Sequence, residues 1–161
     1  MRFGIVVVFA ALCGLAMARP ERVGEHDWRS CHNFPVLNET CIEVFLNEQS
    51  LNVSIRLIVN NHTVFEEDLS ATHLCLDDTE LIKLIELVPA LAPYKKLIDE
   101  IVKVRKFIPA EVFSVCLDVE DLEITKKFAK GCVDMDIVLM CWEKKCLWKG
   151  TEPMGCFNIP L

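Results

Sequence analysis

In residues 51–69, LNVSIRLIVNNHTVFEEDL, two alternating runs flank a pair of asparagines. Apolar residues recur at every second position of the first run, which is the pattern of a strand with one solvated face. These residues are Leu51, Val53, Ile55, Leu57 and Val59. We therefore predict a β-hairpin whose turn contains both asparagines.

The register of this hairpin follows from which residues it would bury. A two-residue turn would direct Glu66 and Asp68 toward the core. A three-residue loop, residues 60–62, instead pairs Leu57 with Phe65 inside. Because a slip of one residue moves every side chain to the other face, we predict the three-residue loop.

Three acceptor sequences for N-linked glycans occur in the chain, and each falls where a sugar would be solvated. Asn61 (N-H-T) lies at the predicted hairpin tip, Asn52 (N-V-S) on the wet face of its first strand, and Asn38 (N-E-T) between two cysteines. We predict glycosylation sites at these three asparagines.

The N-terminus predicts the compartment. Arg2 precedes an apolar run, and Ala16-Met17-Ala18 fits the small residues that signal peptidase requires. We predict a signal peptide over residues 1–18 and a secreted, extracellular chain. No later segment offers 18 uncharged apolar residues, so we expect no membrane span. The net charge of −7 makes nucleic acid and anionic membranes poor partners, because both repel an acidic chain.

Eight cysteines follow the signal peptide, and an even number in an oxidising compartment indicates disulfides. Their pairing is open at this stage. A metal site is the alternative, but no C-x-x-C occurs, and the histidines nearest to cysteines, His32 and His73, lack a second ligand at zinc spacing. We predict no metal and no cofactor. The disulfide cysteines are Cys31, Cys41, Cys75, Cys116, Cys132, Cys141, Cys146 and Cys156.

Further alternating runs predict an antiparallel sheet or sandwich of about five strands. These runs are residues 41–46, 111–123 and 132–141. Residues 19–40 are expected to form an extended arm, and residues 142–161 an irregular tail fixed by disulfides. The fold class is therefore β-rich (α+β) and disulfide-stabilised, with one secreted domain over residues 41–161.

Residues 79–108 interrupt the strands with helical periodicity, for which Asp78 or Thr79 offers an N-cap. Pro89 and Pro93 divide this segment into two helices. The first helix is apolar on nearly every side, so the second helix or a ligand must cover it. We expect a closed core. If the segment encloses a ligand instead, the candidate apolar pocket is formed by Leu84, Val88, Leu97 and Ile101.

Three stretches together resemble an arthropod secreted family that is catalogued as domain of unknown function 4773. They are LNVSIRLIVNNHTVFEEDLSA (51–71), VCLDVE (115–120) and GCFNIP (155–160), so the similarity covers roughly residues 41 to 160. That family has no assigned activity. The resemblance implies a small extracellular β-rich domain and carries over no catalytic residue.

No catalytic motif is present, since G-x-S-x-G, H-E-x-x-H and glycine-rich phosphate loops are all missing from the sequence. A hydrolase using the surface carboxylates of Asp118, Asp134 and Asp136 is a remote alternative. The histidines are expected to lie in the arm or in loops without a serine or cysteine partner. They are His26, His32, His62 and His73.

A small basic cluster near the C-terminus could contact a glycan or an anionic surface, although tryptophans beside cysteines usually pack on disulfides. It comprises Lys144, Lys145 and Lys149, with Trp142 and Trp148 nearby. We therefore predict a secreted interaction or structural module without catalytic activity. Its partner would be an extracellular protein, matrix or glycan. The alternative is a carrier of a small hydrophobic ligand.

Overall fold

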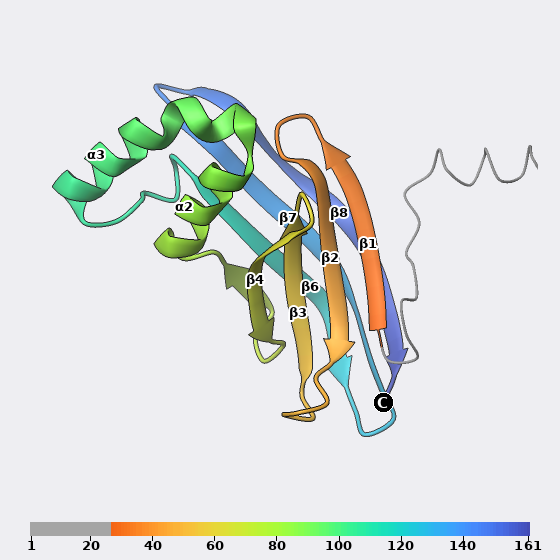
Figure 1. Cartoon of the computed structure of the whole chain (residues 1–161). Helices are drawn as coiled ribbons and strands as arrows, with labels where there is room; N and C mark the ends of the chain where they lie inside the picture. The colour runs from red at the N-terminus through yellow and green to blue at the C-terminus, as the bar shows by residue number, and fades with distance from the viewer. Residues whose placement is uncertain (1–26) are drawn as a thin grey trace, which may run out of the picture.

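The computed structural model describes residues 27–161, so the predicted signal peptide and its cleavage site lie outside the described residues. Two four-stranded antiparallel sheets pack face to face and share one hydrophobic core (Figure 1). The first sheet contains β1 (Asp27–Phe34), β2 (Asn38–Leu46), β3 (Val53–Val59) and β4 (His62–Asp68). The second contains β5 (His73–Cys75), β6 (Ser114–Ile124), β7 (Phe128–Trp142) and β8 (Lys145–Pro160).

A helical segment joins β5 to β6 and covers one end of the sandwich (Figure 1). It consists of α2 (Asp78–Leu87), the 3-10 helix η1 (Pro89–Tyr94) and α3 (Lys95–Arg105). The predicted β-rich class with two helices and a proline elbow is confirmed, and the fold is a sandwich. Among the described residues, no helix is long and apolar enough to cross a membrane.

Two predictions about the chain ends are wrong. From Asp27 onward the expected arm of residues 19–40 is part of the first sheet, where Trp28, Ser30 and Phe34 are buried. The expected irregular tail of residues 142–161 is mostly β8, which pairs with β7 along its length. Both are edge strands, so much of their surface faces solvent and their sequences lack a strong apolar alternation.

These two edge strands join the sheets to each other. The Trp28 ring on β1 packs against Phe157 on β8, with centroids 5.8 Å apart. The buried Ser30 hydroxyl donates a hydrogen bond of 2.6 Å to the Met154 carbonyl oxygen. Gly155 follows with a φ of 122°, and a Cβ there would lie 3.2 Å from the Trp28 ring. Only glycine meets both requirements, so this bend in β8 depends on it.

The β3–β4 hairpin has the predicted register but a different turn. Leu57 pairs with Phe65 as predicted, yet the turn contains only Asn60 and Asn61, both with positive φ. The register shifts between Leu57 and Ile58, so a bulge on β4 supplies the extra residue. The structure therefore reconciles a favoured two-residue turn with a buried apolar face.

Helix α2 is fixed at both ends. Asp77 is the N-cap, in place of the predicted Asp78 or Thr79, and it forms a reciprocal capping box with Glu80. At the C-terminal end, the Asn60 side-chain amide donates to the Leu87 carbonyl oxygen at 3.2 Å. Lys83 donates to the Thr63 carbonyl oxygen at 2.6 Å. The hairpin tip therefore holds the helix over the first sheet.

All eight predicted cysteines form four disulfides, and each disulfide links residues directly opposite on neighbouring strands. None of the four joins one sheet to the other, so each reinforces strand pairing within a sheet. The pairs are Cys31–Cys41, Cys75–Cys116, Cys132–Cys156 and Cys141–Cys146.

Candidate functional site

The end of the sandwich that carries α3 contains a cleft of about 570 Å³, which we call the apical cleft. It lies between α3, the segment that follows it, and the β7–β8 hairpin. Apolar groups and the Cys141–Cys146 disulfide form part of the wall, and charged side chains complete it. The lining residues are Ile101, Arg105, Pro109, Glu111, Val112, Cys141, Trp142, Glu143, Lys144, Cys146 and Lys149.

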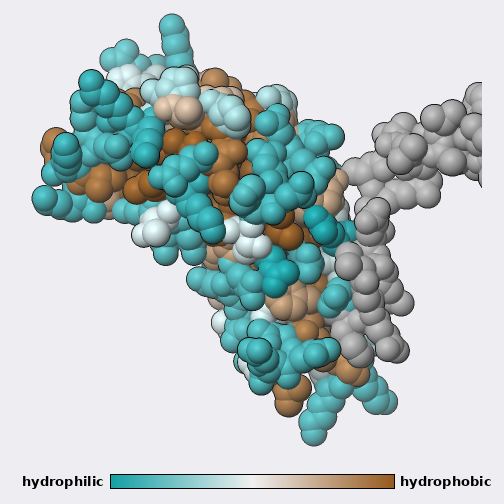
Figure 2. All heavy atoms as spheres, in the orientation of Figure 1, coloured by the Kyte–Doolittle hydropathy of each residue, from teal (hydrophilic) through white to brown (hydrophobic). Residues whose placement is uncertain are grey.

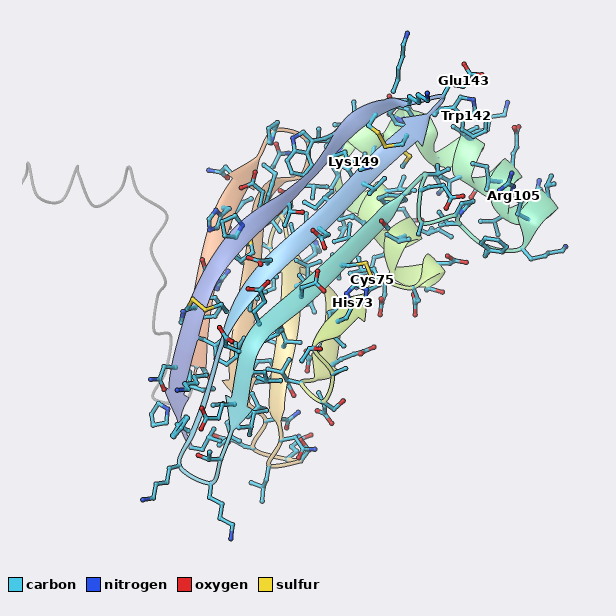
Figure 3. The ribbon with its side chains drawn as sticks, turned by 180° about the vertical axis from the view of Figure 1, so that it is seen from behind. His73, Cys75, Arg105, Trp142, Glu143 and Lys149 are labelled. Carbon is cyan, nitrogen blue, oxygen red and sulfur yellow. A yellow bond between two sulfur atoms is a disulfide. The ribbon has the colours of Figure 1, made fainter. Side chains whose placement is uncertain are left out.

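The fold brings these residues together from two distant segments. Ile101 and Arg105 are one turn apart in α3, so both side chains lie on the same side of the helix. Glu143 and Lys144 form the β7–β8 turn, with φ of 49° and 66°. This turn places Trp142 and Lys149 on the two strands beside α3 (Figure 3).

Exposed apolar side chains concentrate around the apical cleft. Of the seven large hydrophobic side chains that are exposed among the described residues, five belong to α3, the turn after it, or the β7–β8 hairpin. Val104 is 81% exposed and Trp142 is 56% exposed. Figure 2 shows hydrophobic surface over the helical segment. The five are Leu97, Val104, Phe107, Trp142 and Leu147.

The same two segments are positively charged, although the chain is acidic. Residues 95–112 and 141–149 contain eight lysines and arginines and four acidic residues, a net charge of +4, whereas the whole chain carries −7. Seven of these cations form no salt bridge within residues 27–161. The seven are Lys96, Lys103, Arg105, Lys106, Lys144, Lys145 and Lys149.

A second cluster lies on the outer face of the second sheet, away from the apical cleft (Figure 3). His73 Nδ1 lies 2.5 Å from an Asp118 carboxylate oxygen, and His73 Nε2 lies 3.2 Å from Cys75 Sγ. Hydrogen bonds from His73 and then from Asp136 lower the pKa of the Asp118 carboxyl, because they stabilise its charged form. Thr151 donates in turn to Asp136.

This cluster corrects the prediction that no histidine has a cysteine or serine partner. His73 and Cys75 are two residues apart on β5, and alternate residues of a strand share a face. The spacing H-x-C could therefore have indicated that the two side chains are neighbours. This strand was not predicted, because three residues with one buried side chain are too few to show an alternation of apolar and polar residues. Asp118 is one of the three carboxylates that were suggested for a hydrolase, and it forms a hydrogen bond with His73.

The four residues of the candidate apolar pocket do not share one cavity wall. Leu84 and Val88 are fully buried in the core. Leu97 is 38% exposed, and Ile101 lines the apical cleft. The buried residue of α3 is Ile98.

A different apolar cleft, of about 680 Å³, lies at the opposite end of the sandwich, near the β2–β3 and β6–β7 turns. We call it the basal cleft. Hydrophobic residues form most of its wall, and Asn52, a predicted glycosylation site, lies at its margin. The lining residues are Leu46, Leu51, Asn52, Val53, Asp68, Leu69, Ser70, Ile124, Thr125, Lys126 and Leu161.

The three predicted glycosylation sites, Asn38, Asn52 and Asn61, are exposed, and their occupancy stays a prediction. Two groups of side chains have the proximity of metal ligands, Cys31-Glu39-Cys41 and His73-Cys75-Cys116. In each group both sulfurs belong to one disulfide, whereas a metal binds thiolates. These groups therefore do not offer metal sites in the oxidised protein.

Comparison with known proteins adds no relative. No protein-family model, no curated protein and no solved structure matches this chain. The resemblance to domain of unknown function 4773 therefore stays a prediction.

Proposed function

We propose that this protein is a secreted, extracellular interaction module without catalytic activity, and that its apical cleft binds an anionic matrix glycan. The observation that supports the proposal is the combination of Trp142 with Arg105, Lys144 and Lys149 in one cleft. Four disulfides are compatible with an extracellular location.

Each part of the cleft suits such a partner. The indole ring of Trp142 offers a flat apolar surface and an N–H donor, a combination typical of binding interfaces. Arg105 and Lys149 can pair with sulfate or carboxylate groups, and arginine does so in a bidentate manner. Because the positive charge is local, it attracts an anionic polymer even though the whole chain is acidic.

The test is binding to an immobilised sulfated polysaccharide, using protein secreted from a eukaryotic host. We expect Trp142→Ala to weaken binding by about 2 kcal/mol or more, as for central aromatic residues of interfaces. Arg105→Ala with Lys149→Ala should weaken binding and reduce its salt dependence.

The matched control is Lys126→Ala with Lys127→Ala, which removes the same charge from the β6–β7 turn at the opposite end. Equal losses in both double variants would contradict the apical site, because net charge alone would then explain binding. Binding to anionic vesicles but not to the polysaccharide would contradict the glycan assignment.

The basal cleft favours a second candidate function, the carrier of a small hydrophobic ligand. Its volume of about 680 Å³ lies within the usual range for ligand sites, and its wall is mainly apolar. Native mass spectrometry of the secreted protein tests this candidate. A stoichiometric adduct that Leu69→Trp displaces would support a carrier, and protein free of any adduct would count against it.

A further inference from the structure

The four disulfides differ in what surrounds their sulfur atoms. Of the described disulfides, only Cys75–Cys116 has an imidazole against a sulfur, since His73 Nε2 lies 3.2 Å from Cys75 Sγ. Cys75 is exposed and Cys116 is partly exposed, so a thiol in solution can reach the bond. Cys132–Cys156 and Cys141–Cys146 also have one exposed partner each, but no histidine within residues 27–161 contacts them.

The His73 ring is held in the orientation that a proton donor requires. Asp118 contacts Nδ1 at 2.5 Å, so the carboxylate keeps a proton on Nδ1 and directs Nε2 toward the sulfur. In the protonated ring, Nε2–H then points at Cys75 Sγ. Further carboxylates lie nearby on β6 and β7, since Asp134 is opposite Asp118 in the register and Asp136 hydrogen-bonds with Asp118.

We propose that Cys75–Cys116 is a thiol-reactive disulfide, at which His73 acts as general acid toward the Cys75 sulfur and Asp118 positions the imidazole. The reductant is a small thiol, such as a tripeptide thiol, supplied by the surroundings. This reaction is independent of glycan binding, because His73 and Cys75 lie outside the apical cleft (Figure 3).

The exchange proceeds in two balanced steps. A thiolate of the reductant attacks Cys116 Sγ, the disulfide bond breaks, and its electron pair moves to Cys75 Sγ, which receives the Nε2 proton. Cys116 is then joined to the reductant in a mixed disulfide. A second thiolate attacks the reductant's sulfur in this mixed disulfide and releases Cys116 as a thiolate. Two thiols are thereby oxidised to one disulfide, and the Cys75–Cys116 pair is reduced by two electrons.

A general acid at the leaving sulfur should accelerate the first step, because a stabilised thiolate leaves faster. The other three disulfides serve as controls within the same molecule. Cys31–Cys41 is a demanding control, because the Arg29 guanidinium donates to Cys41 Sγ at 3.6 Å, yet Cys41 itself is buried. If a nearby cation were sufficient, Cys31–Cys41 would be reduced fastest. If a positioned proton donor beside an exposed disulfide is required, Cys75–Cys116 is reduced fastest.

The experiment treats the folded, secreted protein with limiting glutathione, traps free thiols by alkylation, and maps the labelled cysteines by mass spectrometry. We expect Cys75 and Cys116 to be labelled at least tenfold faster than any other pair. His73→Gln should reduce this preference to within about twofold, and Asp118→Asn should reduce it partly.

A pH series separates acid catalysis from simple exposure. With rates normalised to the concentration of glutathione thiolate, the wild-type rate should rise as the pH falls from about 8 to about 6, because only a protonated imidazole can donate a proton to the sulfur. The His73→Gln rate should stay flat. Equal opening of all four disulfides, or a rate that His73→Gln leaves unchanged, would overturn the proposal. The wild-type order of opening decides the question even if a variant is not secreted.

Discussion

The disulfides should stabilise the fold unequally, in an order set by the chain length that each one closes. Cys75 and Cys116 are 41 residues apart and enclose both helices, whereas Cys141 and Cys146 are 5 apart across one turn. Cross-linking a longer loop removes more entropy from the unfolded chain. The loop-closure relation gives about 3.9 kcal/mol for the first disulfide and about 2.1 kcal/mol for the second.

The perturbation is replacement of each pair by serines, Cys75→Ser with Cys116→Ser and Cys141→Ser with Cys146→Ser. Unfolding in urea, followed by far-ultraviolet circular dichroism, gives the free energy of unfolding of each variant. We expect the first pair to cost about 2 kcal/mol more than the second. Equal costs, or a larger cost for Cys141–Cys146, would refute the entropic reasoning, since local strand pairing would then dominate.

Four further substitutions test local features of the fold by the same unfolding measurement. Asn60→Ala should lower the free energy of unfolding by about 1–3 kcal/mol, because alanine tolerates a positive φ poorly and cannot donate the hydrogen bond to Leu87. Asn61→Gly should be neutral or stabilising, because glycine adopts a positive φ without strain. Gly155→Ala should destabilise by more than about 1 kcal/mol, because its φ is positive and its methyl group would meet Trp28; a neutral result would contradict the bend. Asp118→Asn should weaken the fall in the free energy of unfolding at acidic pH. The pKa of Asp118 in the folded protein lies below its ordinary 3.8, because His73 stabilises the charged carboxylate. The carboxylate therefore stabilises the fold above pH 3.8, and this contribution is lost as the pH falls through the folded pKa. An unchanged pH dependence of the free energy of unfolding at acidic pH would show that Asp118 does not stabilise the fold.

The elements that could be predicted from the sequence are those whose apolar faces are one-sided and regular. The register of the β3–β4 hairpin was predictable because a slip would have buried Glu66 and Asp68. The turn itself was not, because a bulge on β4 absorbs the extra residue, and bulges leave little trace in an alternation. Likewise β8 was missed, since glycines, a proline and exposed residues break its pattern.

The candidate sites were harder to predict, because each joins segments that are distant in the sequence. Lys144, Lys149 and Trp142 were recognised as a basic and aromatic cluster, but nothing local indicated that Ile101 and Arg105 of α3 would face them. For a related reason, the residues of the alternative apolar pocket, Leu84, Val88, Leu97 and Ile101, do not share one cavity wall. Helical periodicity shows which residues share a face, but it does not show which partner covers that face.

Hydrogen–deuterium exchange with and without a sulfated polysaccharide tests whether the apical cleft is the binding site. We expect slower exchange in residues 101–112 and 141–149 when the polysaccharide is bound, with no change around the basal cleft. Protection confined to the β2–β3 and β6–β7 turns, or no protection at saturating polysaccharide, would contradict it.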